Sequence, residues 1–322
     1  DSVHSITINS PDIITGYVSG KFRIGELGKL FKNSIGGIYT NYQADSISPG
    51  QKLDFNFRIY NKIVEVFFPE VSFEANTFVR GEIVADENEF KLNFKSPGIA
   101  AYGNEMDTID IRIDNKNPLF NTYISVADIS TVYYDLKDFE LINTRLADTL
   151  FFRTEFKGGS QYNDRYSLNF YHTFADGNKS VIGLKRSDIS FKGNTWVLNK
   201  DGNSRNKVIV SQGLDSIDIR EIVMINEERE EILLKGQLAD STYKDLELRF
   251  KIVSLSKITP DLNGFDLKGE VNGVLNVLQE DDVYLPIGNL NISDFKINDE
   301  VQGDLDIGIV GNRDLTEFSV NT

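Results

Sequence analysis

A strict alternation of apolar and polar residues near the C-terminal end is the feature that most constrains the fold. In the first part of the stretch 264–311, every second residue is apolar or glycine: Phe265, Leu267, Gly269, Val271, Gly273, Leu275 and Val277. A period of two is typical of a β-strand, because successive side chains point to opposite faces. The phase slips at Ser293-Asp294 and then resumes, which indicates a bulge or a tight turn. We therefore expect several short antiparallel strands, joined by brief polar turns.

The same alternation recurs along most of the chain. Apolar phases are clear at 53–59, 150–156 and 246–252. Turn signals rich in Gly, Asp and Asn fall between the runs, at 176–178, 192–194, 201–203 and 263–264. No Pro- or Ser-rich linker divides the sequence. We therefore expect residues 1–322 to form one continuous repeating segment, excised from a longer chain.

Two segments interrupt the strand pattern and predict short helical inserts. Residues 27–38 have apolar residues three or four apart, which is the spacing of one helix face. These residues are Leu27, Leu30, Phe31, Ile35 and Ile38. Residues 61–71 predict a single helical turn that ends before Pro69. We expect the first insert to cap the apolar interior of the sheet, and contact with a membrane surface is the alternative.

Composition excludes several classes of function. There are 34 Lys and Arg against 49 Asp and Glu, and the formal net charge of −15 would repel nucleic-acid phosphates. The chain has no Cys, so disulfides, thiol catalysis and Cys-ligated zinc are impossible. It also has no run of about 18 apolar residues that would span a bilayer as a helix. We expect no nucleic-acid partner.

The sequence offers no catalytic constellation. It lacks the nucleophile-elbow, HExxH and phosphate-loop motifs, and His4 and His172 are its only histidines. Hairpin turns explain the Asp-Gly-Asn triplets at 176–178 and 201–203 better than calcium binding does. Carboxylates are plentiful, so a glycosidase pair stays open, but nothing singles one out. We expect no enzymatic activity, no metal and no cofactor.

A sheet with one apolar face must cover that face, and the chain has no long amphipathic helices to cover it. Two architectures satisfy this requirement. Two sheets pack against each other in a β-sandwich with a solid core, or one sheet curls so that its apolar face lines an interior. The alternation alone leaves both open.

The residues also resemble a known family. The run FDLKGEVNGVLNV followed by PIGNLNISDFKINDEVQGDLDI resembles the repeat unit of TamB, the AsmA-like envelope protein of diderm bacteria. The unit falls on 267–277 and 288–309. Residues 6–39, 53–71 and 215–262 are similar to the family as it occurs in Bacteroidetes-type bacteria.

This resemblance implies an elongated, mostly antiparallel curled sheet, that is, a U-shaped β-groove with an apolar lining. It also implies that the chain lies in the periplasm and is anchored to the inner membrane through an N-terminal helix outside these residues. The expected function is a phospholipid conduit that supports outer-membrane biogenesis. The expected partners are acyl-chain lipids and an outer-membrane barrel of the BamA/TamA type.

In such a groove, residues of the apolar phase would contact acyl chains by nonspecific burial. They are Leu53, Phe55, Phe57, Ile59, Leu150, Phe152, Phe156, Leu246, Leu248, Phe250, Leu267, Val271, Leu275, Val301, Leu305 and Ile307. Two other functions stay open. Exposed strand edges would pair with nascent outer-membrane strands in a scaffold or chaperone. A carbohydrate-binding or carbohydrate-degrading envelope protein would need stacked aromatic rings, and the single Trp196 argues mildly against it.

Overall fold

The structure is a computed structural model. It describes residues 3–38, 43–60, 69–132, 134–159, 161–176, 179–211, 213, 215–240, 242–259, 264–281, 283–311 and the backbone of 316–321. The predicted class is confirmed, because the chain is mostly antiparallel β-sheet with few short helices. It divides into two compact units, Asp1–Arg165 (unit 1) and Tyr166–Thr322 (unit 2). Each unit is therefore described by itself. The expected continuity of the sheet from one unit to the next stays a prediction.

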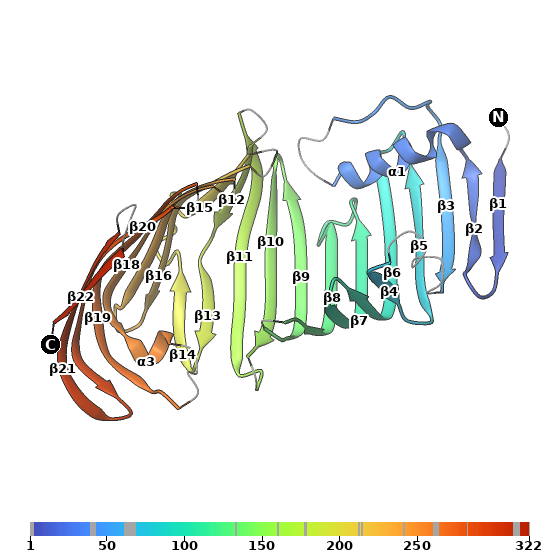
Figure 1. Ribbon diagram of the computed structural model, residues 1–322. Coiled ribbons are helices and arrows are strands. Elements are labelled where there is room, and N and C mark those ends of the chain that lie inside the picture. The colour runs from blue at the N-terminus through green and yellow to red at the C-terminus, as the bar shows by residue number, and fades with distance from the viewer. Residues whose placement is uncertain are drawn as a thin grey trace. The chain divides into compact units, whose positions relative to one another are not determined.

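Unit 1 is a sheet in which most strands pair with the next strand along the chain (Figure 1). Its strands are β1 (His4–Ser10), β2 (Ile14–Lys21), β3 (Lys52–Ile59), β4 (Val71–Phe73), β5 (Thr77–Val84), β6 (Glu89–Ala101), β7 (Asn104–Asp114), β8 (Thr122–Ser130), β9 (Leu136–Leu146) and β10 (Thr149–Gly158). β3 pairs with β5, and β4 pairs with the end of β6. Short hairpin connections explain this simple order, because antiparallel neighbours need only a brief turn between them.

The first predicted helical insert is confirmed. A 3₁₀ turn at Ile24–Glu26 leads into α1 (Leu27–Gly36), and Leu30 of this helix is 1% exposed in the core. Leu27 and Phe31 also pack on the apolar face of the sheet, and so does Ile38, which follows the helix. Ile35 was predicted to cap the interior, but it is 52% exposed. The prediction for Ile35 is wrong because the contact face of α1 is narrower than the apolar stripe.

The second predicted insert falls largely on 61–68, which lie outside the described residues. Only its end is described, and Val71 begins β4 there. The predicted turn at 192–194 is confirmed, because Lys192 and Gly193 both have positive φ in a two-residue hairpin. The hairpin at Asn298-Asp299 has the same backbone signature without glycine.

Unit 2 is the second sheet. Its strands are β11 (Asp164–Ala175), β12 (Lys179–Leu184), β13 (Ser187–Phe191), β14 (Asn194–Leu198), β15 (Lys207–Val210), β16 (Ser216–Asn226), β17 (Glu231–Ala239), β18 (Tyr243–Ser254), β19 (Leu267–Glu280), β20 (Val283–Ile297), β21 (Glu300–Gly311) and β22 (Thr316–Asn321). From β16 to β22 each strand pairs with the next. The strands bend along their length in this part of the sheet (Figure 1).

Between β11 and β16 the sheet is built from short strands. β12 and β15 pair with each other and connect one half of β11 to one half of β16. β13 and β14 connect the other halves of these two strands in the same way. Buried polar side chains satisfy the backbone groups where these short strands break. The Asn199 amide donates to the Leu184 carbonyl at 2.7 Å, and Asn206 Oδ1 accepts from the Val223 amide at 3.0 Å. Such bonds are needed because an unpaired buried backbone group is costly.

The strands near the C-terminal end are longer than predicted. The stretch expected to form several short strands is instead the three long strands β19, β20 and β21. The phase slip at Ser293-Asp294 is a bulge inside β20, where Asp294 has a φ of 51° and the register shifts. A bulge adds one residue without ending the strand, so the alternation resumes in the same element.

Candidate functional site

Continuous rows of apolar side chains cross the sheet of unit 2. One row, read from partner to partner, is Leu198, Met224, Ile232, Phe250, Gly273, Leu290 and Ile307. The next is Ile222, Leu234, Leu248, Leu275, Gly288 and Ile309. Cross-strand partners lie on the same face of a sheet, so the two rows form one apolar surface from β14 to β21.

Most of this apolar surface has no second layer on it. Among the described residues of unit 2, the element that packs on it is α3 (Leu255–Ile258), which lies beside β18 and β19. Next to α3, Trp196, Val253 and Val271 are at most 3% exposed. Away from α3, row residues such as Leu248 and Leu275 are only half-buried. Within the described part of this unit, the apolar face is therefore an open surface, closed locally by one short helix.

A buried ion pair holds α3 in place. The Glu230 carboxylate is 5% exposed, and it lies 3.1 Å from Nζ of Lys257 in α3. It also accepts the Ser254 amide at 3.0 Å and a hydrogen bond from Asn226. Burial lowers the pKa of Lys257, but hydrogen bonds from its ammonium to Glu228 and Glu230 outweigh that effect, so the pKa lies above its ordinary value. Lys257 therefore stays charged at neutral pH and anchors the helix.

Unit 1 has a corresponding apolar surface. One row is Gly16, Phe57, Val79, Phe94, Ile111, Ile124, Leu141 and Thr154. The next is Val18, Phe55, Gly81, Leu92, Ile113, Thr122, Asn143 and Phe152. α1 covers the part formed by β3, β5 and β6, where Leu53, Ile83 and Phe90 are at most 2% exposed.

The structure brings most of the predicted lining residues onto these two surfaces. In unit 1 they are Leu53, Phe55, Phe57, Ile59, Leu150, Phe152 and Phe156. The ring centre of Phe156 lies 6.1 Å from that of Phe139, and the two rings are tilted against each other. In unit 2 they are Leu246, Leu248, Phe250, Leu267, Val271, Leu275, Leu305 and Ile307. Val301 is the exception. It is 71% exposed beside the β20–β21 hairpin, so it contributes no covered apolar area.

The unit 1 rows also contain polar residues that were not predicted from the sequence. Asn143 is 2% exposed, and neither polar atom of its side chain has a hydrogen-bond partner. Its cross-strand partner Thr122 is also polar. Elsewhere in unit 1, Thr77 of β5 and Ser96 of β6 form a hydroxyl pair at 2.6 Å. Alternation gives no signal for such residues, because a single Asn or Thr in an apolar phase looks like a simple interruption.

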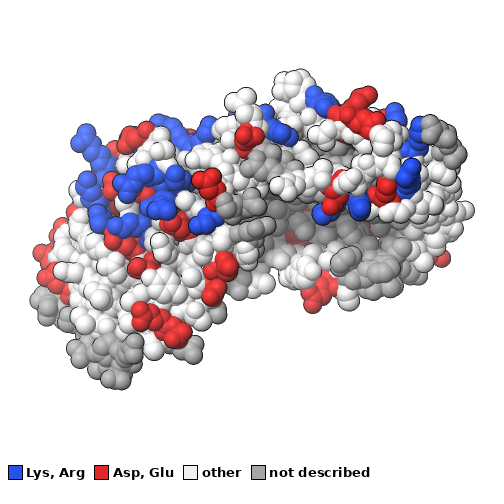
Figure 2. Space-filling model, turned by 90° about the horizontal axis from the view of Figure 1, so that it is seen from above, with Lys and Arg blue, Asp and Glu red and all other residues white. Residues whose placement is uncertain are grey.

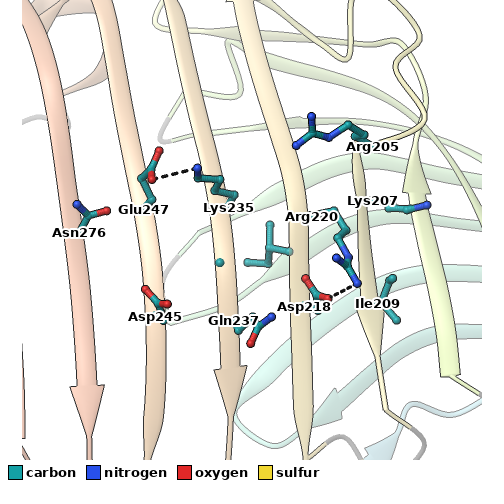
Figure 3. A pocket seen from close by; sticks show the side chains of 12 residues that line it. Arg205, Lys207, Ile209, Asp218, Arg220, Lys235, Gln237, Asp245, Glu247 and Asn276 are labelled. Atoms are coloured by element: carbon teal, nitrogen blue, oxygen red, sulfur yellow. Dashed lines mark ion pairs between the residues drawn. The ribbon is translucent and has the colours of Figure 1, made fainter.

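The opposite face of unit 2 bears a polar pocket of about 720 Å³ (Figure 3). Lys235 and Glu247 pair at 3.1 Å, and Arg220 and Asp218 pair at 2.8 Å. Figure 2 shows Lys and Arg gathered over unit 2 with Asp and Glu among them. Exposed pairs of this kind contribute little stability, so we assign them the role of keeping this face polar.

The opposite face of unit 1 bears a second pocket, of about 510 Å³. Aromatic and amide side chains accompany the charged ones there. The lining residues include Tyr17, Asn56, Arg80, Asn93, Arg112 and Phe120. No sequence motif marks them, because they come from five strands and one loop and meet only through the strand register.

In the described part of the chain, no helix is both long and apolar enough to cross a membrane. Comparison of the chain with protein-family models, curated proteins and solved structures finds no match.

Proposed function

We propose that this chain binds acyl-chain lipids on the apolar face of its sheet and acts as a segment of a periplasmic lipid conduit. The observation that supports the proposal is the continuity of the apolar rows, from β2 to β9 in unit 1 and from β14 to β21 in unit 2. A β-sandwich core would instead bury these rows under a second sheet. Among the described residues, α1 with Ile38 and Ile47 packs on the rows in unit 1, and α3 packs on them in unit 2.

The energetics of such a surface suit a lipid. Each buried CH₂ group contributes about 0.8 kcal/mol, so an acyl chain lying along a row is held while its headgroup stays in water. The contacts are nonspecific and repeat from strand to strand, so a lipid moves along the surface without exposing its chain. Neither nucleotide hydrolysis nor a covalent step is required for this movement.

The resemblance to the TamB family suggests where this activity operates. In this proposal the cargo is phospholipid, the compartment is the periplasm, and an inner-membrane anchor lies outside these residues. An outer-membrane barrel of the BamA/TamA type is the partner that receives the cargo. The polar opposite faces, with their paired charges, would keep the sheet from aggregating.

The exposed edge strand β1 favours a second candidate function, a scaffold for outer-membrane proteins. Among the described strands, β1 pairs only with β2, and its residues are exposed along nearly its whole length. An unpaired edge is a template for another strand. Thr7→Pro in β1 is expected to reduce assembly of outer-membrane proteins if this candidate is right, and to leave lipid binding unchanged.

Lipid extraction with mass spectrometry, on protein purified from its own membranes, tests the first candidate. Wild-type protein is expected to retain phospholipid. The double variant Leu248→Asp, Leu275→Asp loses several buried methylene contacts, which corresponds to an affinity loss of about tenfold or more.

Val274→Asp is the matched control. It lies in the same strand, next to Leu275, but its partners Arg249 and Asn289 are on the polar face. It is expected to retain lipid. Equal lipid content in wild type and the double variant, with both folded, would show that the rows do not carry lipid.

A further inference from the structure

One row of side chains on the polar face of unit 1 differs in chemistry from its neighbours. From β2 to β8 the register places on it Tyr17, Asn56, Arg80, Asn93, Arg112 and Tyr123. The row crosses five steps between strands, which at about 4.8 Å each is a length of about 24 Å. A tyrosine ring stands at each end, and amide and guanidinium groups alternate between the rings.

Every residue of this row except Tyr123 lines the pocket of about 510 Å³, and Phe120 supplies a second aromatic ring there. The charges around the pocket balance, because three cations face three carboxylates. The cations are Arg80, Lys91 and Arg112, and the carboxylates are Asp54, Glu82 and Asp114. Such a lining does not select a charged ligand. It offers donors and acceptors in similar number, which suits a neutral ligand rich in hydroxyl groups.

Several of these groups are fixed in position before any ligand binds. Two hydrogen bonds of 3.1 Å and 2.6 Å join Arg112 to Asp110 in the same strand, and the guanidinium lies 5.6 Å from the centre of the Tyr123 ring. At the other end, the Tyr17 hydroxyl donates to the Asp54 carboxylate, which raises the pKa of Tyr17. Both ends of the row are thus held in place by neighbouring groups.

The centre of the row has unused hydrogen-bonding capacity. Among the described residues, Arg80 has no ion-pair partner. Asn93 Oδ1 is shielded from water and has no hydrogen-bond partner. A polar atom that is shielded from water and has no partner, such as Asn93 Oδ1, is uncommon in native proteins. The exposed Arg80 lies opposite Asn93 on the adjacent strand and lines the same pocket.

We infer that this pocket binds a linear oligosaccharide. Aromatic rings pack against the C–H faces of sugar rings, and side chains with two donors or two acceptors pair with adjacent hydroxyls. A peptide would pair with a strand edge, whereas this pocket lies on the face of the sheet. Phosphate-rich polymers are disfavoured by the three carboxylates. The inference is independent of the proposed lipid function, which uses the opposite face.

Isothermal titration calorimetry of the 322-residue chain tests the inference. The probes are cellohexaose, chitohexaose and xylohexaose, each at millimolar concentration. We expect at least one of them to bind. Arg80→Ala removes the central donor and Tyr17→Ala removes one ring, and each is expected to weaken binding by about tenfold or more.

Arg58→Ala is the matched control. It is an exposed arginine on the same face of β3, in the next row, and it does not line the pocket. It is expected to leave binding unchanged. Circular dichroism confirms that each variant is folded.

The absence of binding to all three probes would overturn the inference. Equal binding by wild type, Arg80→Ala and Tyr17→Ala would do the same. The double variant Leu248→Asp, Leu275→Asp is expected to bind the oligosaccharide as wild type does, so failure of the lipid proposal and failure of this inference give different results.

Discussion

Asn143 is the residue at which the apolar surface of unit 1 departs most from its own pattern. Its side chain is 2% exposed with both polar atoms unpartnered, although it lies in a row between Thr122 and Phe152. Burying such a group costs about 1–3 kcal/mol relative to an apolar group of similar size. Asn143→Leu is therefore expected to raise the free energy of unfolding by about 1–3 kcal/mol. Urea unfolding monitored by circular dichroism measures the change.

Asn206 provides the matched control for this prediction. It is also 2% exposed, but its Oδ1 accepts the Val223 amide at 3.0 Å. Asn206→Leu leaves that amide without a partner and is expected to lower the free energy of unfolding by about 1–3 kcal/mol. A loss of stability in Asn143→Leu as large as that in Asn206→Leu would mean that the Asn143 amide has a partner in solution.

At the scale of elements, α1 is the part of unit 1 that covers its apolar face, and one residue dominates the contact. Leu30 is 1% exposed against Leu53, Phe55 and Phe90. Leu30→Ala is expected to cost about 2–5 kcal/mol, because it removes buried methyl groups and leaves a cavity. Thermal unfolding measures the loss.

Ile35 of the same helix is 52% exposed, so Ile35→Ala is expected to change stability by no more than about 0.5 kcal/mol. If both substitutions have the same effect, α1 does not dock through Leu30.

The elements also show how far the sequence predicts this fold. Strict alternation predicted the strands, their apolar phase and the slip that proved to be the bulge at Asp294, because a period of two is a local property. Strand length in β19–β21 was underestimated, since a bulge and a turn both interrupt the phase. Ile35 was misplaced because the helical stripe does not reveal how much of it the sheet contacts. The polar pockets were missed because their residues meet only through long-range register.

At the scale of the whole molecule, the lipid proposal requires that both units present the same kind of surface to an acyl chain. Photocrosslinking tests this directly in the 322-residue chain. A benzophenone amino acid is placed at Phe152 of unit 1 or at Leu248 of unit 2, which both lie in the apolar rows. The matched control positions are Arg153 and Glu247, the neighbouring residues on the polar faces.

Irradiation of the protein in its own cells is expected to yield lipid adducts at both apolar positions and at neither control, because hydrocarbon is buried only against the apolar phase. Mass spectrometry of the purified protein identifies the adducts. Adducts at Leu248 but not at Phe152 would confine the lipid to unit 2, and would contradict a conduit through both units. Adducts at all four positions would mean that the label reports contact with a membrane rather than a bound lipid. Only the pattern that separates the two faces in both units fits a lipid lying along the sheet.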